Sequence, residues 1–147
     1  MKKISLLLLA SFLLLACPLQ AQQDEDDDKY KKFEQDAISL LGKEFVLSKT
    51  YRFKLVKDGD NAMAHQQYVF SKTSNYSIAI AGNLDKPDQV QIRVYDENNQ
   101  LVAKNTNNTT TLRFTPPKGG IYRITFESTS EKDLLAVGAI GFAKKEQ

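Results

Sequence analysis

Apolar and polar residues alternate with a period of two through most of the chain from residue 44 onward. Tyr51, Phe53 and Leu55, for example, are separated by basic residues. This spacing predicts half-buried antiparallel strands, each with one face in a core and the other in water. The strands expected from it lie near residues 51–56, 66–71, 76–81, 90–95, 112–114, 122–127 and 134–143.

Turn-forming residues separate these segments, which is typical of short strands joined by tight connections. They lie at 58–61, 82–83, 86–88, 96–99 and 116–120. Seven to eight strands at this spacing predict an all-β domain over residues 44–147, an antiparallel β-sandwich. A small closed barrel is the alternative.

A different period appears over residues 29–42. Apolar residues recur there at spacings of three and four, which predicts one short amphipathic helix. Gly42 is a natural stop for it. We expect the stripe to pack against the following domain, although such a stripe could also lie on a membrane or a partner. Its members are Tyr30, Phe33, Ala37, Ile38 and Leu41.

The apolar run from Ile4 to Ala16 follows Lys2 and Lys3 and precedes Ala21, a small residue suited to signal peptidase. The run is too short to span a bilayer comfortably. Residues 1–21 are therefore predicted to be a cleaved signal peptide, and the protein to be exported to the periplasm or secreted.

The same run ends in Leu14–Cys17, which resembles a bacterial lipobox. Lipidation at Cys17 would make the protein an outer-membrane lipoprotein, and the membrane would then be a partner. Residues 22–28 (QQDEDDD) are expected to form a solvated acidic tether. An acidic stretch after the cysteine is similar to the surface-export signal of lipoproteins from Bacteroidetes-type bacteria.

Composition narrows the possible partners and the chemistry. Removing residues 1–21 lowers the 20 Lys and Arg residues to 18, equal to the 18 Asp and Glu residues. A neutral chain argues against nucleic acid, which requires a basic face. Cys17 is the only cysteine, so a disulfide within the exported domain is not expected.

The segment Gln67–Phe126 carries a Tyr-Val-Phe strand, a Tyr-Ser-Ile-Ala-Ile strand, a strand ending in Val-Tyr-Asp, and Phe-Thr-Pro-Pro before Gly-Ile-Tyr-Arg-Ile. These motifs resemble the bacterial pre-peptidase C-terminal (PPC) domains and, more loosely, the related collagen-binding domains. The resemblance implies an eight-stranded jelly-roll-like sandwich that serves as an accessory module of secreted enzymes. We also expect the Tyr122 hydroxyl to bond an upstream backbone group, as in a tyrosine corner.

The inventory of catalytic residues is small. His65 is the only histidine, so a triad or a zinc site lacks its usual residues. Carboxylates that could converge in a small secreted hydrolase lie in turn-like segments, where Asp favours local hydrogen bonds. They are Asp58, Asp60, Asp85, Asp88, Asp96 and Glu97. We expect no catalytic residue, metal or cofactor.

Arginine and tyrosine residues on the polar side of the strands are the candidates for a ligand-facing patch. They are Arg52, Arg93, Tyr95, Arg113 and Arg123. The interpretation that follows is an exported, non-catalytic binding or accessory module that contacts a polymer, a cell-surface component or a partner protein. The alternatives are an envelope lipoprotein with a structural role and, less favoured, a small secreted hydrolase.

Overall fold

A computed structural model describes residues 17–106 and 108–144 of the chain. One helix, α2 (Cys17–Leu40), precedes eight strands in the described residues. All strand pairs are antiparallel, which confirms the predicted all-β fold with one preceding helix. The strands are β1 (Val46–Asp58), β2 (Asn61–Phe70), β3 (Ser74–Gly82), β4 (Gln91–Tyr95), β5 (Leu101–Lys104), β6 (Thr111–Phe114), β7 (Gly120–Thr129) and β8 (Leu134–Lys144), with a 3₁₀ turn η1 (Pro87–Gln89) before β4.

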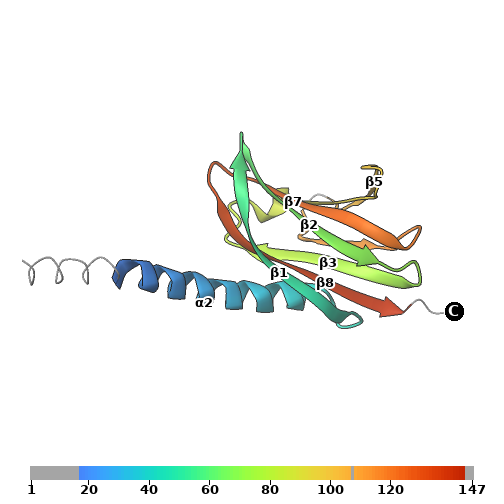
Figure 1. The fold of residues 1–147 in the computed structure, drawn as a ribbon, viewed down its shortest axis with the longest axis horizontal. Helices are drawn as coiled ribbons and strands as arrows, with labels where there is room; N and C mark the ends of the chain where they lie inside the picture. Colours follow the sequence, from blue (N-terminus) through green and yellow to red (C-terminus); the bar gives the residue numbers. More distant parts are fainter. Residues whose placement is uncertain (1–16, 107, 145–147) are drawn as a thin grey trace, which may run out of the picture.

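The strands form one sheet, in the order β5-β4-β7-β2-β1-β8-β3-β6, that folds back on itself (Figure 1). We call β6, β3, β8 and residues 46–55 of β1 the helix-side layer, and β5, β4, β7 and β2 the open layer. β1 joins them, because residues 46–55 pair with β8 and residues 56–58 pair with β2. The result is a two-layered sheet that is nearly closed, since β5 and β6 at its two ends contact each other.

The main core lies between the two layers and is rich in aromatic residues. Phe53 of the helix-side layer stacks on Phe126 of the open layer, with ring centroids 5.2 Å apart. Both rings lie over Gly138, where a Cβ atom would be 2.9 Å from Phe126 Cζ. Glycine is therefore required at this point of β8 for the close approach of the ring.

Helix α2 covers the outer face of the helix-side layer along β8 and β3 (Figure 1). Ala37 and Leu41 form a second buried cluster with small residues of the sheet, including Ala79 and Ala139. The chain then leaves the helix at Gly42, whose φ of 98° lies in the left-handed region. The prediction that the apolar stripe packs against the following domain is thus confirmed for most of its members.

Three expectations from the sequence are wrong. Ile38 was placed on the buried stripe but is 36% exposed, because a helix turns by about 100° per residue and Ile38 lies beside the line of Ala37 and Leu41. The small alternate residues of β3, Ser77, Ala79 and Ala81, were expected on a wet face. All three are buried instead, and Ala79 and Ala81 pack in the cluster that α2 forms with the sheet.

The third correction concerns the acidic run of residues 22–28. It belongs to α2 and is not a separate tether, so the helix also begins before residue 29. Basic residues near the run compensate its charge: Lys29 Nζ lies 2.7 Å from Glu25 Oε1, and Lys31 Nζ lies 3.0 Å from Asp28 Oδ1. Pairs at these spacings support a helix.

Residues 1–16, which hold most of the predicted signal peptide, lie outside the described residues. Within the described part, α2 is not apolar enough over its length to cross a membrane.

Candidate binding site

The structure divides the five predicted patch residues between the two outer faces. Arg52 and Arg113 lie on the helix-side layer, where they bind the segment that covers it. Arg52 is 3.0 Å from Asp27 Oδ1 and 2.9 Å from Glu34 Oε2. Arg113 is 2.6 Å from Glu44 Oε1. Both guanidinium groups therefore hold α2 and the following turn against the sheet.

Arg93, Tyr95 and Arg123 lie together on the outer face of the open layer. The Arg123 guanidinium stands 4.7 Å from the centroid of the Tyr95 ring, its register partner on β4. Arg93 Nη1 is 2.7 Å from Glu127 Oε2 of β7 and also contacts Gln91. The charged groups of this half of the patch likewise have partners within the molecule.

His65 lies on the same outer face, with Nδ1 3.0 Å from Thr125 Oγ1 of β7. Of the six turn carboxylates, Asp96 accepts hydrogen bonds from the backbone N–H groups of Asn98 and Gln100, and Glu97 pairs with Lys118. In the described residues, no group of three or more His, Cys, Asp and Glu side chains could hold a metal ion.

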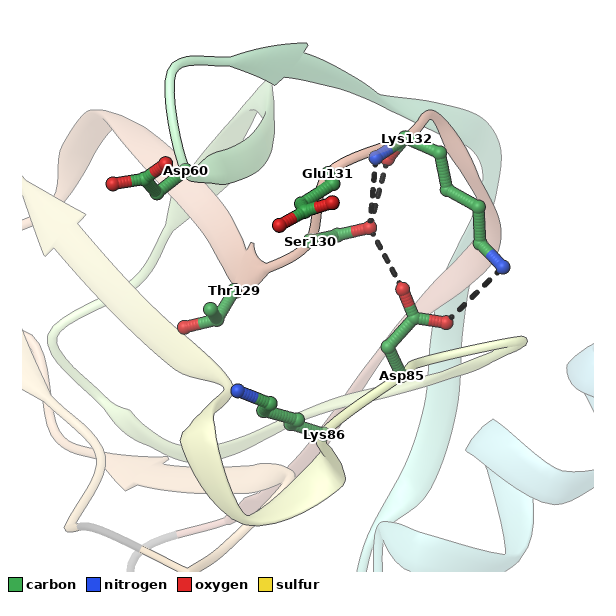
Figure 2. A pocket seen from close by; sticks show the side chains of 7 residues that line it. All are labelled: Asp60, Asp85, Lys86, Thr129, Ser130, Glu131 and Lys132. Carbon is green, nitrogen blue, oxygen red and sulfur yellow. Dashed lines mark hydrogen bonds and ion pairs between the residues drawn. The ribbon is translucent and has the colours of Figure 1, made fainter.

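Asp60 and Asp85 line one hollow at the end of the sheet where three connections meet, but their carboxylates do not point toward each other (Figure 2). They line a hollow of about 510 Å³ with Lys86, Thr129, Ser130, Glu131 and Lys132. Ser130 Oγ, which is buried, donates to Asp85 Oδ2 at 2.9 Å, and Lys132 Nζ lies 3.4 Å from Asp85 Oδ1.

We call this the end hollow, and its contacts determine the acid–base chemistry of Asp85. The hydrogen bond from Ser130, and then the neighbouring Lys132, lower the pKa of Asp85 below its usual value of 3.8. Such a carboxylate is a poor general base at neutral pH. The backbone N–H of Ser130 also donates to Asp60 O at 3.0 Å. The polar groups therefore tie the β1–β2, β3–η1 and β7–β8 connections together.

A second hollow lies where β1 and β2 diverge, and we call it the β1–β2 cleft. The two strands pair over residues 56–58 and 61–63, then separate as β1 follows β8 and β2 follows β7. The cleft measures about 420 Å³. It is lined by Lys49, Tyr51, Gln67, Tyr68, Val69 and Ile121.

Two hydroxyl contacts bridge the cleft. Tyr51 Oη donates to the backbone oxygen of Gln67 at 2.8 Å, and Ser48 Oγ lies 2.6 Å from Tyr68 Oη. A register shift in β1 between Leu47 and Lys49 marks a bulge at Ser48, beside the residues that line the cleft. Burial raises the pKa of Tyr51, and the nearby Tyr68 raises it further.

One wall of the cleft is apolar and open to solvent. Val69 of β2 and Ile121 of β7 are register partners on the outer face, and they are 66% and 60% exposed. Lys49 Nζ lies 4.9 Å from the centroid of the Tyr51 ring. The cleft thus combines an exposed aliphatic pair, two phenol hydroxyls and a cation within one concave surface.

This cleft is not predicted from the sequence. A pattern in the sequence does indicate its apolar wall, because Val69 and Ile121 are β-branched aliphatic residues at positions of their strands that alternate with core residues. The convergence of Lys49 and Tyr51 with Val69 depends on where β1 leaves β2, which no local pattern encodes.

The sequence matches no family model and no curated protein. Among solved structures, the chain is similar to that of PliG from Aeromonas hydrophila, described as a periplasmic lysozyme inhibitor of g-type lysozyme. The identity is 12% and the TM-score 0.46, over 69% of this chain and 88% of that chain. Neither value is high enough to indicate a shared function. The resemblance to PPC domains stays a prediction.

Proposed function

We propose that the protein is an exported, non-catalytic binding module that holds a partner protein at the β1–β2 cleft. The observation that carries this proposal is the exposed register pair of Val69 and Ile121 beside the hollow. Burial of an aliphatic side chain of this size contributes about 1.5–3 kcal/mol. An exposed apolar pair next to a hollow is the kind of surface that protein interfaces use.

A protein suits the cleft better than a polysaccharide because each tyrosine ring already contacts a neighbouring side chain. The Tyr68 ring packs on Phe70, with centroids 4.7 Å apart, and Lys49 lies over Tyr51. Their hydroxyls, in contrast, reach the cleft. A sugar stacking on a ring face would have to displace these contacts, whereas an aliphatic or polar peptide group would not.

The proposal includes export of the protein, with processing either by cleavage after Ala21 or by lipidation at Cys17. Cleavage after Ala21 and lipidation at Cys17 would both alter the N-terminal end of α2. The helix residues that pack on the sheet begin at Tyr30, so either form would retain the same domain and the same cleft.

Site-specific photocrosslinking in the producing cells tests the proposal. A benzoylphenylalanine at Val69 should give one discrete adduct with a protein, identified by mass spectrometry. The same group at Val56 is the matched control, because Val56 is similarly exposed (57%) but lies near the β1–β2 turn outside the cleft. Equal adducts at both positions, or none at Val69, would overturn the proposal.

A further inference from the structure

Strand β2 has an edge that is free in the described part of the molecule. It pairs with β7 along its whole length, from Asn61 to Phe70, but with β1 only over residues 61–63. In an antiparallel ladder, the N–H and C=O groups of alternate residues point to the same side. The backbone oxygen of Gln67 points toward β1, because it accepts the hydrogen bond of Tyr51 Oη. The backbone groups of His65 and Val69 therefore point toward the cleft as well.

The hydrogen bond from Tyr51 to Gln67 occupies part of this edge in the structure. A single phenol hydroxyl, at 2.8 Å, occupies one backbone acceptor of a segment that offers several donors and acceptors. An incoming strand would replace this hydroxyl with its own N–H and add further ladder bonds. Edges of this kind are templates for pairing with another chain.

The charges around the cleft indicate what such a strand carries. No carboxylate lines the cleft. Lys49 within it belongs to none of the ion pairs formed among the described residues. Arg52, Arg93 and Arg113 on the outer faces, in contrast, have intramolecular carboxylate partners. An acidic segment complements a lysine that lacks a carboxylate partner.

We propose that the partner protein inserts an extended, acidic segment into the β1–β2 cleft, where it adds to the free edge of β2. This inference rests on the proposed function and specifies its mode. A residue opposite Val69 extends the aliphatic row of Val69 and Ile121 on the outer face. The next residue points the other way, into the cleft and toward Lys49. The segment therefore alternates aliphatic and acidic residues.

The test uses a short peptide of alternating valine and glutamate, blocked at both ends, titrated into ¹⁵N-labelled protein. Chemical-shift changes should concentrate in the amides of residues 64–70 and 49–51. The same peptide with alternate backbone nitrogens methylated keeps its side chains but loses donors, so its affinity should fall at least about tenfold. A valine–lysine peptide should bind weakly.

Two variants separate strand addition from simple attraction of charge. Lys49→Glu should weaken the glutamate peptide about tenfold, while Lys54→Glu, the same change on the opposite side of β1, should not. Tyr51→Phe removes the hydroxyl that competes for Gln67 O, so it should strengthen binding about threefold. A purely structural role of Tyr51 would not produce a gain in affinity.

Several results would overturn the inference. Equal binding of the methylated peptide, absence of binding, or shift changes centred on another strand would exclude addition to β2. Shifts of residues 64–70 that depend on protein concentration without peptide would show that a second copy of the chain occupies the edge. A specific crosslink at Val69 together with failure of the peptide would leave the proposed function standing and the strand mode wrong.

Discussion

The two layers of the sheet differ in what covers their outer faces, and the side chains on those faces explain why. On the helix-side layer the outward residues of β3 and β8 are small, among them Ala79 and Ala139, both fully buried. Small residues let a helix approach a packed surface closely, because the separation depends on the side chains at the contact. On the open layer the outward residues are long and polar, such as Arg93 and Glu127. They lie across the sheet and cover it themselves.

Thr125 illustrates how side chains alone cover the outer face of the open layer. It is on the outer face of β7, between His65 and Arg93 in the cross-strand register, yet it is only 5% exposed. Neighbouring side chains protect it without any helix. The comparison teaches that small outward residues leave room for a covering helix, whereas long polar side chains cover a sheet face themselves.

The largest loss of stability is expected from a charged residue placed between α2 and the sheet. Ala139→Lys places an ammonium group at a position with no exposed surface and overfills the contact with Ala37 and Leu41. The free energy of unfolding should fall by about 3–5 kcal/mol. Leu101→Lys, on β5 of the open layer at 48% exposure, should change it by less than about 0.5 kcal/mol. Urea denaturation of both variants measures this, and similar losses would contradict the comparison.

A smaller, pH-dependent effect on the free energy of unfolding is expected at Glu34 of α2, which contacts β1. Hydrogen bonds from Thr50 Oγ1, at 2.7 Å, and then from Arg52 lower the pKa of Glu34 below its usual 4.5. A lowered pKa means that the carboxylate contributes stability above pH 4.5, and that this contribution disappears as the pH falls through the folded-state value.

Glu34→Gln should therefore lower the free energy of unfolding by no more than about 1 kcal/mol near neutral pH. The difference between the two proteins should shrink toward zero in acid. Thermal or urea unfolding of wild type and variant between pH 7 and pH 3 measures the difference. A gap that stays constant over this range would show that Glu34 does not stabilise the helix contact through its charge.

The smallest effect on stability should come from the cleft. Val69→Thr combined with Ile121→Thr keeps β-branched side chains at two exposed positions, so the free energy of unfolding should change by less than about 0.5 kcal/mol. Partner binding should nevertheless fail. An excess of this double variant should not reduce the adduct formed at Val69, whereas an excess of Leu101→Lys should. Competition by both would place the partner outside the cleft.

Local patterns were sufficient for the strands other than β5, which none of the expected segments covers, and for several connections. Tyr122 Oη donates to Lys118 O at 2.8 Å, as expected for a tyrosine corner. Asp96 caps its own turn, and Asn99 in that turn has a left-handed φ of 60°. Each of these features is determined by residues close in sequence, so the sequence predicts them.

The errors arose where distant parts of the chain meet. Alternation predicts a wet face for Ala79 and Ala81 because it cannot distinguish water from a covering helix. The acidic run is expected to be a tether because its contact with the sheet, from Asp27 to Arg52, joins residues 25 positions apart. The candidate site was missed for the same reason, since it exists only through the divergence of β1 from β2.

The shared position of β1 has a consequence for how the molecule unfolds. This strand bonds to β8 over residues 46–55 and to β2 over residues 56–58, so one continuous backbone belongs to both layers. Neither layer can open completely without loosening a strand of the other. Amide hydrogens in the centres of β8 and β7 should therefore exchange with solvent through the same global opening and report one free energy. The domain would behave as a single cooperative unit despite its two layers.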